Sequence, residues 1–359
     1  MKKFGLAAAA GSLIFGGASV GFMANTDAKS ESKLMHTRVA YDKSSVAVLP
    51  DVKISRSITS PIDTTGFGLR LYQYQSCPFC CKVRAFFDYY GFAYDVVEVN
   101  SVTRKQTRFS EYTKVPILVA TGYHNKQMND SSYIISLLRS FILDPAKELD
   151  EVASFYPIYK INDEKGKSRF EFENKYFVMF QEQLKDDKKA IETRKEERTW
   201  RIWVDDNLVH TISPNIYRTF SESLDSFRWF SKFGNWEENF PTWERIFVVY
   251  VGAAAMYFIG KRLKKKHGLK PDVRQSLYDS CNEWLRGKGS HRTFMGGEKP
   301  NLADLAVYGV LTSFEGTQAF ADLLQQTAIG PWFYATQEAV RCRLGAEEFS
   351  RRLKAVRAS

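Results

Sequence analysis

The stretch LRLYQYQSCPFCCKVRAFF, residues 69–87, decides the fold of this chain. Its first residues alternate between apolar and polar and predict a short strand, and the C-P-F-C motif predicts a tight turn. Apolar residues at helical spacing then predict a helix that Gly91 ends. Pro78 suits the first helical position, where its missing N–H costs nothing. Cys77 therefore falls at the N-terminus of the helix, where free N–H groups and the helix dipole favour a thiolate.

Cys77 and Cys80 form a C-x-x-C motif, which occurs in redox dithiols and in zinc sites. A structural zinc site needs two more ligands at matching spacing, and the remaining cysteines are isolated: Cys81, Cys281 and Cys342. Between a strand and a helix the motif is typical of thioredoxin-like domains, so we expect a reactive thiol and no metal site. Three cations nearby in sequence would lower the pKa of the Cys77 thiol further: Arg70, Lys82 and Arg84. We expect Cys281 and Cys342 to be inert thiols in the core.

The residues that follow fit the same kind of domain. Residues 92–99 predict a second strand, parallel to the first, and residues 103–112 predict a polar helix. Residues 114–120 predict a strand that opens with Pro116. In thioredoxin-like domains this proline is cis and lies beside the cysteine turn, and Val115 before it offers its backbone N–H and C=O to an extended peptide.

Asp130 and Ser131 precede an apolar helix predicted over residues 133–142. They can cap that helix, and the same side chains and N–H groups can hold the γ-glutamyl end of glutathione. The two roles are compatible.

Several segments together closely resemble the membrane-associated prostaglandin E synthase type 2 family, a glutathione-transferase-like group. They occur in order between about residues 66 and 332: LYQYQSCPFC (71–80), VVEVN (96–100), KVPILVA (114–120), NDSS (129–132), HTISPNIYRT (210–219), GAAAMY (252–257), KRLK (261–264) and FMGGEKPNLADLAVYG (294–309).

The resemblance implies an α/β thioredoxin-like domain followed by an all-α glutathione-transferase-like domain. It implies a glutathione-dependent isomerase that converts prostaglandin H2 into prostaglandin E2. Cys77 would assist cleavage of the O–O bond while a proton leaves the adjacent carbon, Tyr74 would hydrogen-bond the thiol or the oxygen, and Cys80 would complete the catalytic set. Glutathione would lie along Cys77, Phe79, Val115, Pro116, Asp130 and Ser131. Family members can also bind haem through the glutathione sulfur, and proteins of this type usually form homodimers.

Two other functions stay open. The same turn could work as a glutaredoxin-type thiol–disulfide oxidoreductase or transferase, in which Cys77 attacks mixed disulfides and Cys80 resolves them. Cys81 departs from the family's usual residue and could divert such intermediates. Alternatively, the chain could be a non-catalytic membrane module that binds haem or glutathione. Isomerase activity would need only Cys77, whereas dithiol exchange would need both Cys77 and Cys80.

Residues 4–23 are uncharged and follow Lys2 and Lys3, which predicts a membrane anchor or a cleaved targeting segment. A reactive dithiol suits a reducing compartment, which disfavours full secretion. The resemblance implies an anchor with the globular part in the cytosol, at the Golgi or another endomembrane. Mitochondrial targeting is the alternative. The net charge of +10 comes without a nucleic-acid-binding motif, so the expected partners are a lipid substrate and a membrane surface, and not nucleic acid.

The expected organisation has six parts: an N-terminal anchor or targeting segment (1–24), a flexible tether (25–65), a thioredoxin/glutaredoxin-like domain (66–143), a connector with a β-hairpin and a charged segment (144–196), an all-α domain like the C-terminal domain of glutathione transferases (197–346) and a basic tail (347–359).

Within the all-α part, the apolar run at residues 246–260 is too short to span a bilayer, so we expect the buried central helix of that domain. The cations that follow it would form a solvated helix end or contact an acidic group such as a lipid phosphate: Lys261, Arg262 and Lys266. Asn301 and Asp304 predict a capping box. His210 is interpreted as a helix-end residue rather than as a ligand.

Overall fold

The computed structural model describes residues 37–41, 46, 48–162, 168–181 and 188–358. The predicted anchor at residues 1–24 lies outside these residues, and so does the turn of the predicted hairpin at residues 163–167.

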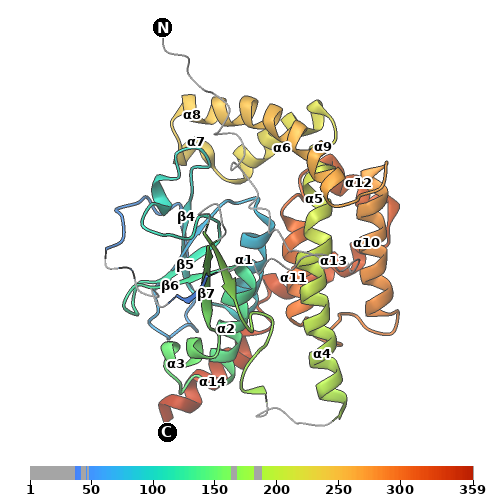
Figure 1. Cartoon of the computed structure of the whole chain (residues 1–359). Coiled ribbons are helices and arrows are strands. Elements are labelled where there is room, and N and C mark those ends of the chain that lie inside the picture. Colours follow the sequence, from blue (N-terminus) through green and yellow to red (C-terminus); the bar gives the residue numbers. More distant parts are fainter. Residues whose placement is uncertain (1–36, 42–45, 47, 163–167, 182–187, 359) are drawn as a thin grey trace, which may run out of the picture.

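A five-stranded sheet with the strand order β2-β4-β3-β5-β6 organises the N-terminal half (Figure 1). Its strands are β2 (Arg56–Ile58), β3 (Leu69–Gln73), β4 (Tyr94–Glu98), β5 (Ile117–Ala120) and β6 (Lys126–Asn129). Strand β4 runs parallel to β3, as predicted, because helix α1 (Pro78–Tyr90) crosses over between them. The other pairs are antiparallel. The thioredoxin-like arrangement is therefore confirmed.

Helix α1 begins and ends where the sequence predicts. Cys77 is its N-cap residue with extended backbone, and Pro78 occupies the first turn. Gly91 ends the helix in the left-handed conformation, with φ of 76°, and donates its N–H to the carbonyl of Phe87. Local sequence alone thus fixes where the cysteine motif sits on the helix.

Two predictions for this half are wrong. β2 is an edge strand of the main sheet, and β1 (Thr37–Ala40) pairs with strand β7, so these parts of the predicted tether at residues 25–65 are built into sheets. The predicted polar helix at residues 103–112 is a single 3₁₀ turn, η2 (Lys105–Thr107). Arg104 has a φ of 49°, a left-handed conformation that interrupts a right-handed helix.

A second, three-stranded sheet of order β1-β7-β8 packs near the cysteine turn. Strands β7 (Ile158–Asn162) and β8 (Ser168–Phe172) pair antiparallel, with Lys160 opposite Phe170. The rings of Phe170 and Phe172 lie with their centroids 5.9 and 6.0 Å from that of Tyr112. This sheet therefore covers the part of the main domain that holds Val115.

The remaining elements are helical (Figure 1). They are α2 (Ser131–Leu143), α3 (Leu149–Ser154), α4 (Lys188–Trp203), the π-helical segment η4 (Val204–Leu208), α5 (Val209–Ile216), α6 (Phe220–Phe233), α7 (Trp236–Asn239), α8 (Thr242–Phe247), the π-helical segment η5 (Val248–Gly252), α9 (Ala253–Lys266), α10 (Val273–Lys288), α11 (Leu302–Thr312), α12 (Gln318–Gln326), α13 (Ile329–Arg341) and α14 (Ala346–Ala358).

Helix α11 is the buried central helix of the C-terminal half, and it packs directly on α1. The capping box predicted at its start is confirmed: Asn301 accepts the N–H groups of Ala303 and Asp304, and the Asp304 carboxylate accepts the N–H of Asn301. A Cβ atom added to Gly309 would lie 2.6 Å from the Cα atom of Lys82. Because only glycine allows this approach, α11 fixes α1 from behind the cysteine motif.

The run at residues 246–260 is not the buried central helix, contrary to the prediction. It belongs to one continuous helix, Thr242–Lys266, formed by α8, η5 and α9 along one end of the molecule, at the top of Figure 1. About a third of its most apolar window is buried. The apolar run forms one buried face and one exposed face. A hydropathy pattern does not distinguish such a helix from one that is buried on all sides.

Two predictions near the C-terminus are also wrong. The residues predicted as a basic tail form α14, whose buried Phe349 packs on Phe92 with ring centroids 4.5 Å apart. Glu348 of the same helix pairs with Arg139 of α2 at 3.0 Å. Cys342 is exposed and not a core thiol, whereas Cys281 is buried, as predicted.

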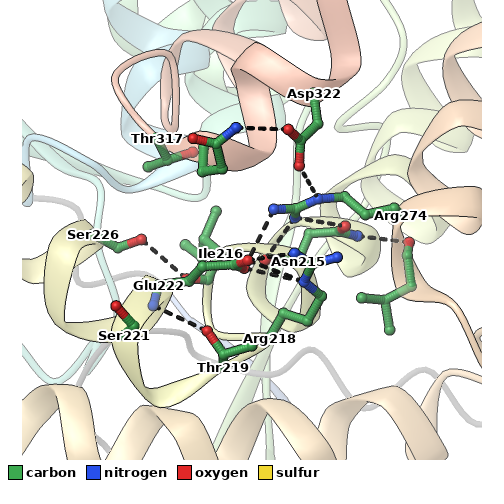
Figure 2. A network of polar contacts seen from close by, with 12 residues as sticks. Asn215, Ile216, Arg218, Thr219, Ser221, Glu222, Ser226, Arg274, Thr317 and Asp322 are labelled. Carbon is green, nitrogen blue, oxygen red and sulfur yellow. Dashed lines mark hydrogen bonds and ion pairs between the residues drawn. The ribbon is translucent and has the colours of Figure 1, made fainter. Parts of the chain in front are cut away.

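A buried polar network holds helices α5, α6, α10 and α12 together (Figure 2). Arg274 donates to the carbonyl of Asn215 at 2.8 Å and forms ion pairs with Asp322 at 2.8 Å and Glu222 at 3.3 Å. Since the buried guanidinium has hydrogen-bond partners on three other helices, it fixes their mutual positions.

Candidate active site

The cysteine turn joins the end of β3 to the start of α1. The N–H of Cys77 donates to the carbonyl of Tyr74 at 3.0 Å and closes the turn, and the N–H of Cys81 donates to the carbonyl of Cys77 at 2.9 Å and begins the helix. The Cys77 side chain is 3% exposed and Cys80 is fully buried. Both thiols are free.

The surroundings of the two thiols separate their acidities. Burial by itself would raise the pKa of Cys77, but hydrogen bonds from the Cys80 thiol and from the N–H groups of Cys80 and Phe79, together with the charge of Arg84, outweigh it and lower this pKa. Burial and the neighbouring Cys77 raise the pKa of Cys80 well above its ordinary value. Cys77 is therefore the thiol that ionises, and Cys80 keeps its proton.

Of the three cations predicted to act on Cys77, Arg84 does so most directly. It is buried and donates to the carbonyl of Gln75 at 2.7 Å and to the sulfur of Cys81 at 3.0 Å. Lys82 is also buried, but it forms an ion pair with Asp205 of η4, and so it connects the two halves of the chain. The third, Arg70, lies 4.0 Å from Asp95 on the neighbouring strand.

Tyr74 has a buried hydroxyl group without a hydrogen-bond partner among the described residues. Burial raises the pKa of this phenol to about 12, so it stays protonated at neutral pH and can donate. One guanidinium nitrogen of Arg104, whose charge acts on Tyr74, is likewise buried without a partner in the described part of the chain. Two unused donors thus lie next to the cysteine turn.

The predicted cis bond between Val115 and Pro116 is confirmed. Val115 lies in one apolar cluster with Cys77 and Cys80, as expected. Its backbone N–H and C=O make no hydrogen bond to any described residue, although Val115 is buried. Its use as a ligand for an extended peptide stays a prediction. Tyr112, which belongs to the same cluster, was not predicted as a site residue because it was assigned to a polar helix.

Asp130 and Ser131 lie at the start of α2, where the capping role is confirmed for Asp130, and Ser131 is the first residue of the helix. One oxygen of Asp130 accepts the N–H groups of Ser132 and Tyr133 at 2.9 and 3.2 Å. Its other oxygen pairs with Lys175 at 3.1 Å, a residue that sequence reasoning missed because it lies far away along the chain. Burial raises the pKa of the Tyr112 hydroxyl well above its ordinary value, and the negative charges of Asp130 and the Cys77 thiolate add to this rise. The glutathione role of Asp130, Ser131, Val115 and Phe79 stays a prediction.

A pocket opens beside the cysteine turn, between the N-terminal half and helices α6, α7 and α8. On one side it is lined by the three residues that precede Cys77, namely Tyr74, Gln75 and Ser76. Its opposite wall is largely apolar and includes Phe230, Trp236, Phe240 and Val248. Largely apolar walls with a few polar groups are typical of small-molecule sites.

Glu98, at the end of β4, lines this pocket and was not predicted as a site residue. Its carboxylate accepts the N–H of Gln75 at 2.7 Å and the amide of Gln73 at 3.2 Å. Burial raises its pKa to about 7, and these hydrogen bonds and the charge of Arg84 limit the rise. Its position at the end of the predicted strand next to the cysteine motif could have identified Glu98 from the sequence.

We expect Glu98 to make the stability of the protein pH-dependent. The folded chain keeps a proton that the unfolded chain releases near pH 4.5, so the free energy of unfolding falls as the pH rises from about 4.5 to 7. The size of this contribution is about 3 kcal/mol. In urea unfolding measured across this range, Glu98→Gln should show a flatter pH dependence than the native chain. Equal slopes in the two proteins would contradict the assignment.

The described residues contain no group of three or more His, Cys, Asp or Glu side chains that could hold a metal ion. His210 is not at a helix end, contrary to the prediction, because α4, η4 and α5 form one continuous helix around it. Its ring stacks on that of His267 with centroids 3.9 Å apart. Haem bound through glutathione sulfur would need no side-chain ligand, and this expectation stays a prediction.

The chain is similar to several known proteins. A family model described as the N-terminal domain of glutathione S-transferase matches residues 71–140. Prostaglandin E synthase 2 of Danio rerio is 47% identical over 286 residues, which are 79% of this chain and 74% of that protein. Prostaglandin E synthase 2 of Mus musculus is 47% identical over 297 residues, which are 81% of this chain and 75% of that protein.

Solved structures similar to this one are more distant in sequence. Glutathione S-transferase III in its apo form is 13% identical, with a TM-score of 0.41, over 78% of this chain and 96% of that chain. Glutaredoxin 2 from Salmonella typhimurium in complex with glutathione is 13% identical, with a TM-score of 0.37, over 78% of this chain and 98% of that chain.

Proposed function

Because the chain belongs to the prostaglandin E synthase 2 family, we propose that it is a glutathione-dependent isomerase that converts prostaglandin H2 into prostaglandin E2. The observation that carries this proposal is Cys77, an acidified thiol at a helix N-terminus, next to a pocket with largely apolar walls. Prostaglandin H2 is an apolar acid with a strained endoperoxide, and such walls suit its chains.

The reaction moves no net electrons. The O–O bond breaks, the carbon that bears one oxygen loses its proton and becomes a ketone, and the other oxygen takes a proton and becomes a hydroxyl. The Cys77 thiolate is the base that accepts the proton from carbon. The Tyr74 hydroxyl, which is protonated and has no other partner among the described residues, donates to the oxygen that departs. Transfer of the proton from Cys77 back to Tyr74 completes the cycle. Throughout, the Cys80 thiol stabilises the Cys77 thiolate by donating a hydrogen bond to it.

Glutathione would lie along the groups that the sequence assigns to it. The free backbone groups of Val115 suit its cysteinyl part, and the N-terminus of α2 with Asp130 and Ser131 suits its γ-glutamyl end. Lys175 adds a cation next to Asp130 that can meet a carboxylate. Phe79 and Pro116 would complete the walls of this site. Bound glutathione would supply a second thiol beside Cys77.

Thiol–disulfide exchange is a second candidate function, which the opposed acidities of Cys77 and Cys80 favour. In this reaction the Cys77 thiolate attacks a mixed disulfide of glutathione, and the displaced thiol leaves with the electron pair of the S–S bond. Cys80 then attacks Cys77, which releases glutathione and leaves a Cys77–Cys80 disulfide that an external thiol reduces.

The proposal includes the membrane attachment and the oligomeric state of the enzyme. The uncharged run at residues 4–23 supports a membrane anchor that leaves the rest of the chain in the cytosol, at an endomembrane such as the Golgi. We also propose that the enzyme is a homodimer, because proteins of this type usually form homodimers.

The test is to incubate the purified full chain with prostaglandin H2, with and without glutathione, and separately with a glutathione mixed disulfide. We expect prostaglandin E2 to form faster than in buffer and its formation to depend on glutathione. Reduction of the mixed disulfide without any conversion of the endoperoxide would favour the second function instead. If the chain shows neither activity, it is a non-catalytic module.

A further inference from the structure

The long helix formed by α8, η5 and α9 exposes a stripe of large apolar side chains. Their spacing of three and four residues places them on one face of the helix. Trp243 and Phe258, near the ends of the stripe, are each 67% exposed. The exposed residues of this stripe are Trp243, Ile246, Phe247, Tyr250, Val251 and Phe258.

The opposite face of the same helix is buried. Gly252 lies against the ring of Phe227 in α6, and Ala253 and Met256 are buried with it. The exposed stripe is therefore not a poorly packed core face, because the helix already has its core face elsewhere. A contiguous exposed apolar surface of this kind marks an interaction site.

The stripe runs directly into a cluster of cations at the end of α9: Lys261, Arg262, Lys264, Lys265 and Lys266. None of them forms an ion pair with another described residue; Lys261 donates to the hydroxyl of Tyr257 and Lys264 to the carbonyl of Pro271. By helical spacing Lys261 and Lys265 continue the face that carries Tyr250 and Phe258. The surface thus joins aromatic side chains to positive charge that no described carboxylate neutralises.

We propose that this helix lies on an anionic lipid bilayer, with the stripe from Trp243 to Phe258 in the boundary between headgroups and acyl chains and the lysines at the lipid phosphates. Aromatic side chains favour that boundary, and amphipathic helices of this composition bind there. The helix lies flat on the bilayer and does not span it, because its other face is buried against α6.

A bilayer fits this surface better than a second copy of the chain does. A second copy would have to offer carboxylates to the five cations, and two of the three carboxylates near the start of the helix, those of Glu237 and Glu244, are engaged within the chain. Glu237 pairs with Arg245 at 3.0 Å, and the buried Glu244 accepts from the amide of Asn100. Lipid phosphates supply the missing negative charge without such a constraint.

The same helix also lines the pocket beside the cysteine turn, through Glu244, Arg245 and Val248. A helix seated on a bilayer brings this pocket close to the lipid. An apolar substrate can then pass from the bilayer into the pocket without crossing bulk water. The membrane contact itself does not depend on the identity of that substrate.

The test follows one position on the helix in the full chain, so that contact through another segment does not mimic it. Cys342→Ser removes the exposed cysteine and Cys77→Ser removes the reactive one, and Phe258→Cys then receives an environment-sensitive fluorophore. The matched control carries the fluorophore at Tyr334→Cys, which is similarly exposed but lies on α13. Each protein is mixed with phosphatidylcholine vesicles that contain phosphatidylserine and acyl-chain-brominated lipid.

At position 258 we expect a shift of emission to shorter wavelength and quenching by the brominated lipid, and at position 334 neither. With Lys261→Gln and Lys265→Gln added, the lipid concentration for half-maximal quenching at position 258 should rise about thirtyfold. The urea concentration at half-unfolding should be unchanged by the two lysine substitutions, which shows that the variants keep their fold.

Two outcomes would overturn the proposal. Equal quenching at positions 258 and 334, or none at either, excludes a specific contact of this helix with lipid. A wavelength shift at position 258 that depends on protein concentration and needs no vesicles identifies a second copy of the chain as the occupant.

Discussion

Replacing Cys77 by serine is expected to lower prostaglandin E2 formation by about two to four orders of magnitude, which is the range that a positioned proton-transfer group contributes. A serine hydroxyl stays neutral at physiological pH, so the helix terminus, the Cys80 thiol and Arg84 have no anion to stabilise. The structure adds a second expectation. Because Cys77 has a lowered pKa, its alkylation by iodoacetamide should reach half-maximal rate below the ordinary thiol value of about 8.5.

The companion variant Cys80→Ser separates the two proposed functions. A serine hydroxyl can still donate to the Cys77 sulfur, so isomerisation should persist, whereas release of a mixed disulfide through an internal Cys77–Cys80 bond should be lost. Cys342→Ser, an exposed cysteine remote from the turn, is the matched control and should change neither activity. Full isomerase activity in Cys77→Ser would rule out the Cys77 thiolate as the base.

Replacing Gly309 by alanine is expected to destabilise the fold where α11 packs on α1. The added Cβ would lie 2.6 Å from the Cα and 2.7 Å from the N of Lys82, and backbone cannot move aside as a side chain can. Overpacking of this kind costs about 1–3 kcal/mol. Since the displaced residues directly follow the cysteine motif, the alkylation midpoint of Cys77 should also move.

The control for Gly309→Ala is Gly330→Ala, in helix α13. There the nearest atom to an added Cβ is a Leu324 methyl at 3.6 Å, an ordinary contact, so alanine should leave stability unchanged or raise it by up to about 1 kcal/mol. Urea unfolding of both variants measures the difference. If Gly309→Ala unfolds at the same denaturant concentration as Gly330→Ala, α11 does not support α1 as described.

Much of the site could be predicted because it depends on short-range sequence. Pro78 and Gly91 set the limits of α1 by the backbone angles that they favour, and this alone places Cys77 at its N-terminus. The helix caps at Asp130 and Asn301 follow the same local rule. The resemblance to a family was recognised from several short segments that occur in the same order along the chain. The relatives at 47% identity confirm it.

What could not be predicted depends on contacts between distant residues. The sequence places Lys82 next to the motif, but only the folded chain brings Asp205 to it and so diverts its charge from the thiol. Glu98 acquires its raised pKa from burial, which no spacing in the sequence reveals. The same holds for Lys175 beside Asp130.

The sequence by itself determined the strand, turn and helix that carry Cys77, because backbone preferences and helix capping act over a few residues. Only the tertiary structure decided which apolar helix is central. Helix α11 and the run at residues 246–260 are both apolar, but α11 meets α1 through Gly309, while the other helix buries one face and leaves the second exposed. Hydropathy records how much apolar surface a segment has, and the partner that covers it is set by the packing of the whole chain.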